Sequence, residues 1–136
     1  MLGKEHPNTL GSMMGLASSL HLQGKFVEAE ALGRQTLQLK EKVLGKEHLD
    51  TLASINNLAL SLHSQGKFVE AEALHRRTLQ LKEKVLGKEH PDTLASIMGL
   101  ASSLHSQGKF IEAEALDRQT LQLKEKVFGK EHLDRA

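Results

Sequence analysis

Histidine is the residue of this sequence that most readily suggests chemistry, because eight histidines occur in only 136 residues. Seven of them form two sets that recur every 42 residues: His6, His48, His90 and His132, and His21, His63 and His105. Nitrogen ligands must lie within about 2.1 Å of a zinc ion, whereas copies of one helical unit lie roughly 10 Å apart. We therefore expect no metal site. The first set should cap or pack the turns, and the second should be exposed.

Catalysis is not predicted either. The sequence has no cysteine nucleophile, and its Glu and His residues recur along the chain instead of converging. No Gly-rich phosphate loop follows a strand. We predict no enzymatic activity and no cofactor. The Lys-Glu-Lys segments that begin at Lys40, Lys82 and Lys124 are expected to form a solvated helix face.

Composition narrows the class of partner. The formal net charge is only +1, and there is no Trp or Tyr, which argues against nucleic-acid binding. No stretch approaches the ~20 apolar residues that a membrane span needs, and the N-terminus lacks the apolar run of a signal peptide. The absence of cysteine suits a reducing compartment. We predict a cytoplasmic protein with a protein or peptide partner, without nucleic-acid or membrane contacts.

Internal repetition decides the expected fold. The string Leu-Gly-Lys-Glu-His begins at Leu2, Leu44 and Leu86, so the period is 42 residues. We predict three repeats, 2–43, 44–85 and 86–127, with 128–136 as the truncated start of a fourth. Together they should form one solenoid domain, because a single helix pair cannot bury its own apolar face.

Each repeat is predicted to contain two helices. In repeat 2 the first runs from about Asp50 to Gln65 and the second from about Lys67 to Leu86, with apolar residues at intervals of three and four. Gly66 should form a left-handed cap. The first buried stripe should comprise Leu52, Ile55, Leu58, Ala59 and Leu62, and the second Phe68, Ala71, Leu74, Thr78, Leu81 and Val85.

These repeats resemble the tetratricopeptide repeat. The resemblance rests on the pattern Ile55, Leu58-Ala59, Leu62, Gly66, Phe68 and Ala71 and its equivalents. The 42-residue period and Asn-Asn-Leu-Ala are similar to the kinesin light chain type. The resemblance implies an all-α, right-handed helical-repeat solenoid of six helices, and peptide binding on a concave face lined by the first helices. One departure is that the family's aromatic residue after Ala is replaced by Gly33, His75 and Asp117.

The candidate peptide site lies on the exposed side of the first helices, where most differences between the repeats fall. Its Asn amides can both donate and accept hydrogen bonds, and its Met side chains adapt to varied partners. No Lys or Arg lies on these helices, which argues against capture of a C-terminal carboxylate. The predicted site comprises Met14, Ser18, His21, Asn56, Asn57, Leu60, His63, Met98, Ser102 and His105.

Two functions remain open from the sequence. The first is a scaffold that binds a peptide or partner segment on the concave face. The second is a self-assembling array without a dedicated ligand, because neither end carries the polar cap usual in solenoids. Stacking of copies from head to tail would cover both ends, although the tail from Phe128 to Ala136 could instead fold back over the C-terminal face.

Overall fold

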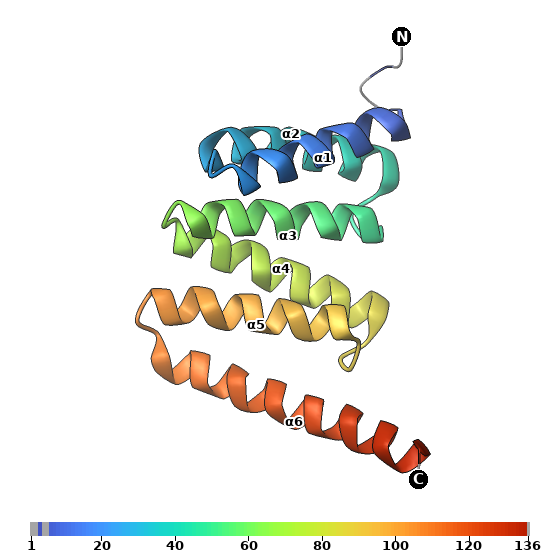
Figure 1. Ribbon diagram of the computed structural model, residues 1–136, viewed down its shortest axis with the longest axis vertical. Helices are drawn as coiled ribbons and strands as arrows, with labels where there is room; N and C mark the ends of the chain where they lie inside the picture. Colours follow the sequence, from blue (N-terminus) through green and yellow to red (C-terminus); the bar gives the residue numbers. More distant parts are fainter. Residues whose placement is uncertain (1–2, 4–5, 136) are drawn as a thin grey trace.

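The computed structural model describes residue 3 and residues 6–135, with the side chains of residue 7 and of residues 130–135 outside the description. This part of the chain consists of six α-helices and contains no strand. The helices stack in sequence order, and each packs mainly against the helices before and after it (Figure 1). They are α1 (Pro7–Leu22), α2 (Phe26–Leu44), α3 (Leu49–Ser64), α4 (Phe68–Leu86), α5 (Pro91–Ser106) and α6 (Phe110–Arg135).

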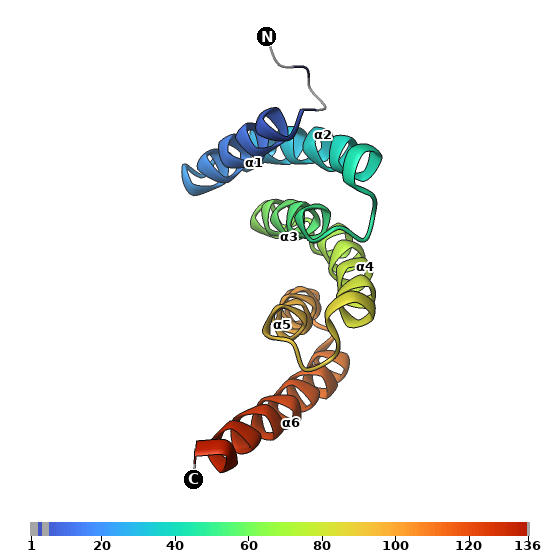
Figure 2. The ribbon, with the colours of Figure 1, turned by 90° about the vertical axis from the view of Figure 1, so that its right-hand side faces the viewer.

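The stack is an arc whose inner side carries the first helices of the repeats. Figure 2 shows α1, α3 and α5 on one side and α2 and α4 on the other, while α6 slants beneath α5 from the second side to the first. This arrangement confirms the all-α solenoid of three helix-turn-helix units expected from the sequence.

The turns at the two ends of the first helices have the same hydrogen bonds in all three repeats. Each first helix begins after a histidine that accepts a hydrogen bond from the backbone N–H two residues later, at 3.1–3.2 Å between Nδ1 and N. Each is followed, two residues after its end, by a glycine with positive φ, for example 79° at Gly66. The next residue, Lys67, donates its backbone N–H to the Leu62 carbonyl over 2.9 Å, which completes a Schellman-type cap. The predicted capping roles of His48 and Gly66 are thus confirmed.

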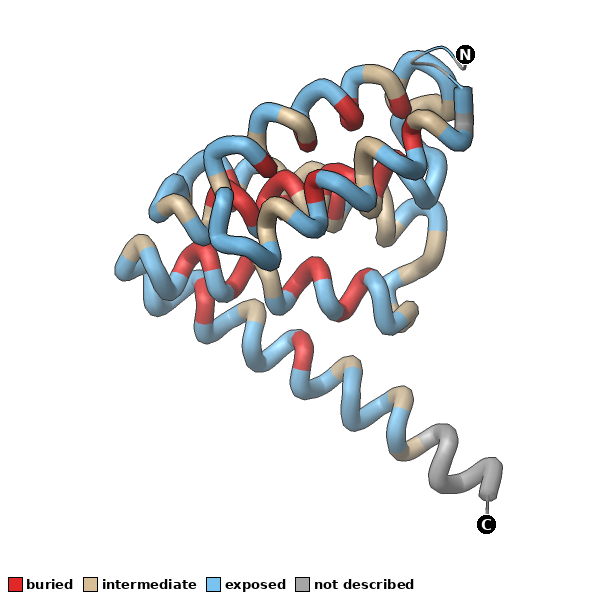
Figure 3. Tube along the Cα trace, turned by 45° about the horizontal axis from the view of Figure 1, so that its top comes forward, coloured by how far each residue is buried: buried red, intermediate tan, exposed pale blue. Residues whose placement is uncertain are grey.

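The apolar core follows the first-helix stripe. Leu52, Ile55, Leu58, Ala59 and Leu62 are all buried, and Figure 3 shows buried residues gathering where neighbouring helices face one another. On α4, Ala71 and Thr78 are buried, and Phe68, Leu74 and Leu81 are half-buried. Val85 is exposed, so its predicted place in the core was wrong. It lies in the last turn of α4, two residues before Gly87.

The Lys-Glu-Lys segments are not uniformly solvated, which corrects a second expectation. Lys40 is only 4% exposed, and its Nζ lies 3.0 Å from Met14 Sδ and 3.5 Å from the Asp50 carbonyl oxygen. Burial lowers the pKa of Lys40, and the charge of Asp50 partly opposes this. Lys82 is half-buried and Lys124 is exposed. The same residue type is therefore at least half-buried where another repeat follows and exposed on the last helix.

The last helix departs from the pattern of the other repeats. Helices α2 and α4 end before Gly45 and Gly87, which both have a φ of 91°. Helix α6 instead continues through Gly129 to Arg135, so the start of the expected fourth repeat extends this helix (Figure 1). The described part of the tail does not fold back over the C-terminal face, and Ala136 lies outside the described residues.

Candidate peptide-binding site

The predicted site residues lie on α1, α3 and α5, with their side chains at least partly accessible. Five are exposed: Ser18, Leu60, Met98, Ser102 and His105. The other five are half-buried: Met14, His21, Asn56, Asn57 and His63.

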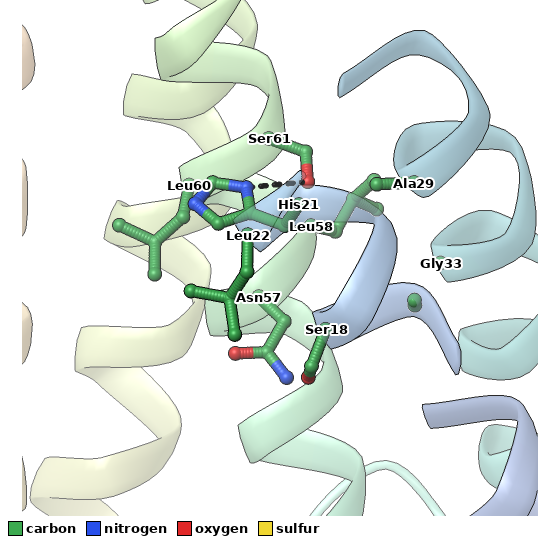
Figure 4. A pocket seen from close by; sticks show the side chains of 10 residues that line it. Ser18, His21, Leu22, Ala29, Gly33, Asn57, Leu58, Leu60 and Ser61 are labelled. Atoms are coloured by element: carbon green, nitrogen blue, oxygen red, sulfur yellow. Dashed lines mark hydrogen bonds between the residues drawn. The ribbon is translucent and has the colours of Figure 1, made fainter. Parts of the chain in front are cut away.

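Four of the ten predicted residues surround one pocket between the first two repeats. Ser18 and His21 reach it from α1, and Asn57 and Leu60 reach it from α3. The pocket has a volume of about 210 Å³. The Ser61 hydroxyl and His21 Nδ1 are 3.4 Å apart at its edge (Figure 4). Its other lining residues are Ala17, Leu22, Ala29, Gly33, Leu58 and Ser61.

The remaining predicted residues do not join this pocket. Met14 is partly used within the fold, because its Sδ contacts Lys40 Nζ and lies 3.8 Å from Ser54 Oγ. The pocket is not lined by the other five, Asn56, His63, Met98, Ser102 and His105, which lie on α3 and α5.

The histidines at the ends of the first helices pack against phenylalanine. The rings of His21 and Phe26 meet edge to face with centroids 5.0 Å apart, and those of His63 and Phe68 at 4.9 Å. These two histidines are half-buried, so the expectation that they are exposed was wrong. His105 is exposed, and its Nε2 lies 3.0 Å from Asp117 Oδ2. The described residues contain no group of three or more potential metal ligands.

The pocket depends on a glycine that the sequence-based prediction did not include. Gly33 on α2 faces the space from the side opposite Ser18 and Asn57 (Figure 4). The signal was present in the sequence, because Gly33 occupies the position of His75 in the next repeat. A residue without a side chain at a position that holds a ring in the next repeat indicates a gap in packing.

His75 shows how a ring fills this position in repeat 2. Its side chain is buried, and its Nδ1 has no hydrogen-bond partner among the described residues. Burial lowers the pKa of His75 to about 4, with smaller contributions from His63 and Lys82. At neutral pH the ring is therefore uncharged, and it fills the junction between repeats 2 and 3 as a largely apolar group.

Ion pairs and hydrogen bonds also link α2 to the turn between α3 and α4. The carboxylate of Glu30 accepts hydrogen bonds from Arg34 at 2.8 Å, Gln65 at 2.9 Å and Lys67 at 3.2 Å. These bonds, led by Arg34, lower the pKa of Glu30 to about 2. Glu72 has the same environment one repeat later, and its pKa is also about 2.

Comparison with known proteins assigns this architecture to a family. The sequence profile of the tetratricopeptide repeat matches residues 8–84 and again residues 50–126. The chain belongs to the tetratricopeptide repeat family. Proteins of this family generally mediate protein–protein interactions, and the fold is a non-enzymatic scaffold type. No curated protein matches the sequence.

Solved structures connect these tetratricopeptide repeats with the kinesin light chain type. Two are structures from Podosopora anserina described as putative kinesin light chain nearly identical TPR-like repeats, one of them a single-residue variant of the other. Both are 33% identical over 93% of this chain, with TM-scores of 0.83 for the variant and 0.81 for the other. BtubC (BKLC) from P. vanneervenii has the same fold, with a TM-score of 0.85 and 21% identity over 93% of this chain. The chain covers 59%, 60% and 50% of these proteins, respectively.

No helix in the described part of this tetratricopeptide array is both long enough and apolar enough to cross a membrane.

Proposed function

We propose that this chain is a non-enzymatic scaffold whose inner surface binds a peptide segment of a partner protein, across α1, α3 and α5. The observation that supports this proposal most directly is the pocket between the first two repeats. Ser18, His21, Asn57 and Leu60, which were chosen from the sequence alone, all line it. A concave site with mostly apolar walls and a few polar groups is typical of ligand recognition.

The chemistry of this surface favours a neutral, partly apolar peptide. Leu60 and Met98 are exposed large apolar side chains, and the amides of Asn56 and Asn57 can bond to a peptide backbone. The described first helices carry no Lys or Arg, so they supply no fixed positive charge for a terminal carboxylate.

A peptide selection against the purified chain tests the proposal. The variant Leu60→Glu/Met98→Glu places two charges on the inner surface at exposed positions, so we expect it to lose the selected peptides while its melting curve stays nearly unchanged. Val69→Glu is the matched control, because Val69 is an exposed aliphatic residue on α4. Peptides that bind the groove variant as tightly as the control would refute the proposed site.

A second candidate function, head-to-tail association of copies, is supported by the two ends of the stack. Leu16 on α1 is 54% exposed, whereas its equivalent Leu58 is 2% exposed beneath the preceding repeat. Leu121 on α6 is also exposed, and its equivalent Leu37 is buried. The ends are thus the two halves of an internal junction, and they could accept either a second copy or further repeats of a longer chain.

Charged residues at the two ends of the stack also match the ion pairs of the internal junctions. At the internal junctions Arg34 donates to Glu70 and Arg76 donates to Glu112, both at 3.1 Å. The equivalent donor on α6 is Arg118, and the equivalent acceptor on α2 is Glu28. An α1–α2 pair stacked on α6 would therefore repeat the internal ion pairs.

Sedimentation over a wide concentration range tests association. Leu16→Glu should weaken it, and Val69→Glu should not. A wild-type chain that stays monomeric up to millimolar concentration would exclude this second function without affecting the first.

A further inference from the structure

The two internal junctions of the solenoid are built from equivalent residues but differ at one pair. Between repeats 2 and 3, the His75 ring packs against Gly99 so closely that a Cβ on Gly99 would lie 2.7 Å from its Cε1. Between repeats 1 and 2, the equivalents are Gly33 and Asn57. At the second junction the larger residue, His75, lies on α4 and the glycine on α5, whereas at the first junction the glycine lies on α2 and the larger residue, Asn57, on α3. The space that the His75 ring fills at the second junction is open at the first.

This open space is the pocket described above. It exists because Gly33 and Asn57 stand where the next junction has His75 and Gly99. A Cβ on Gly33 would lie 3.6 Å from Leu58 Cδ1, an ordinary contact with no clash. Asn57 does not replace the missing ring, since it comes from the opposite helix and the pocket remains. Within the described part of the chain, the Asn57 amide makes no hydrogen bond, so it is available to a ligand.

The mouth of the pocket is also more apolar than its counterpart. Leu22 and Leu60 line it, and they are 85% and 42% exposed, respectively. The equivalent residues one repeat later are Ser64 and Ser102. Covering two water-exposed leucines at the mouth of a cavity with an apolar group lowers the free energy of the complex. The cavity and its mouth thus point to the same kind of occupant.

We propose that this pocket binds an aromatic side chain of the partner peptide. The inference rests on the proposed function and specifies which part of the peptide is recognised. The volume of about 210 Å³ exceeds the roughly 150 Å³ of an apolar cavity that holds benzene. No charged residue lines the pocket, and the equivalent space in this chain accommodates the neutral His75 ring. A ring with one polar group at its edge could also bond to the Asn57 amide.

The probe for this test is p-cresol, the side-chain analogue of tyrosine, titrated against the whole chain and followed by methyl NMR. We expect saturable shifts at Leu22, Leu58 and Leu60, with binding in the millimolar range. The variant Gly33→His/Asn57→Gly rebuilds the filled junction in repeats 1 and 2 and should abolish these shifts. Unchanged shifts in this variant, or no saturable shift in the wild type, would overturn the inference.

The reciprocal variant should create a second pocket, at the junction between repeats 2 and 3. His75→Gly/Gly99→Asn opens the second junction, so a second p-cresol molecule should bind and shift the Leu100 methyl groups. If this variant does not fold, Gly33→His/Asn57→Gly still decides the question, because it fills space and creates no cavity. A folded reciprocal variant with no second site would overturn the inference.

A peptide obtained from the selection then tests the pocket inference separately from the proposed function. Replacing its aromatic residue by Ala should weaken binding to the wild-type chain by about tenfold or more, as for other buried interface anchors. The same replacement should have little effect on Gly33→His/Asn57→Gly. If peptides bind the groove but show no such coupling, the pocket inference fails and the groove proposal stands. If p-cresol binds and no peptide does, the proposed function fails.

Discussion

Replacing glycine by alanine at three helical positions of this chain should give stability changes of opposite sign. Gly15, Gly33 and Gly99 all lie inside helices, and alanine is better by about 1 kcal/mol in a helix interior. A Cβ on Gly15 would meet nothing within 4 Å, and one on Gly33 would make an ordinary contact with Leu58. We therefore expect Gly15→Ala and Gly33→Ala each to raise the free energy of unfolding by about 1 kcal/mol.

Gly99→Ala should behave differently because its Cβ would overlap a buried ring. The added atom would lie 2.7 Å from Cε1, 3.0 Å from Nδ1 and 3.2 Å from Nε2 of His75. That side chain is 2% exposed, so it has little room to move. Overpacking of this kind costs about 1–3 kcal/mol, which cancels or exceeds the helix-propensity gain. Gly99→Ala should therefore be about 1–3 kcal/mol less stable than Gly15→Ala.

Denaturant unfolding followed by far-UV circular dichroism measures all three variants under one condition. His75→Ala removes the obstructing ring, so Gly99→Ala should become favourable in that background. Equal stability of Gly99→Ala and Gly15→Ala would refute the argument, as would a Gly33→Ala variant less stable than the wild type.

The remaining predictions concern acid and the turns. Because the pKa of His75 is lowered to about 4, its unfolded form binds a proton more readily, and stability should fall as pH drops from about 6.5 to 4, by roughly 3 kcal/mol. His75→Phe should remove this decline in pH-dependent denaturant unfolding, and an unchanged decline would contradict the assignment. The carboxylates of Glu30 and Glu72, with pKa values of about 2, stabilise the fold above pH 4.5, and this contribution should be lost as pH falls through 2. Glu72→Gln should reduce that loss in acid titrations, and a wild-type profile in the variant would show that the ion pairs contribute little. Gly66→Val should lower stability by about 1 kcal/mol or more, since a β-branched residue resists the φ of 79°. An unchanged melting temperature would contradict this interpretation of the turn.

Much of this fold could be predicted because its information is local and repeated three times. The 42-residue period, the first-helix stripe around Ile55 and the glycine at position 66 indicate where helices form, which face is buried and where the chain turns. Four of the predicted site residues meet at one pocket, because a helical period places Ser18 and His21, or Asn57 and Leu60, near each other on a helix face.

The rest depended on contacts between repeats, which the period of a single repeat cannot supply. Lys40, Lys82 and Lys124 occupy the same position in nearly identical segments, yet only Lys124, which no further repeat of this chain covers, is exposed. The pocket required the same information. Gly33 is visibly different from His75 in the sequence, but only stacking shows that it faces Asn57 across a junction while His75 faces Gly99. The sequence alone determined the helices, their buried stripes and their turns, because neighbouring residues within one repeat encode them. Only the tertiary structure decided which exposed face contains a cavity, because that cavity is the missing volume of one side chain between two different helices.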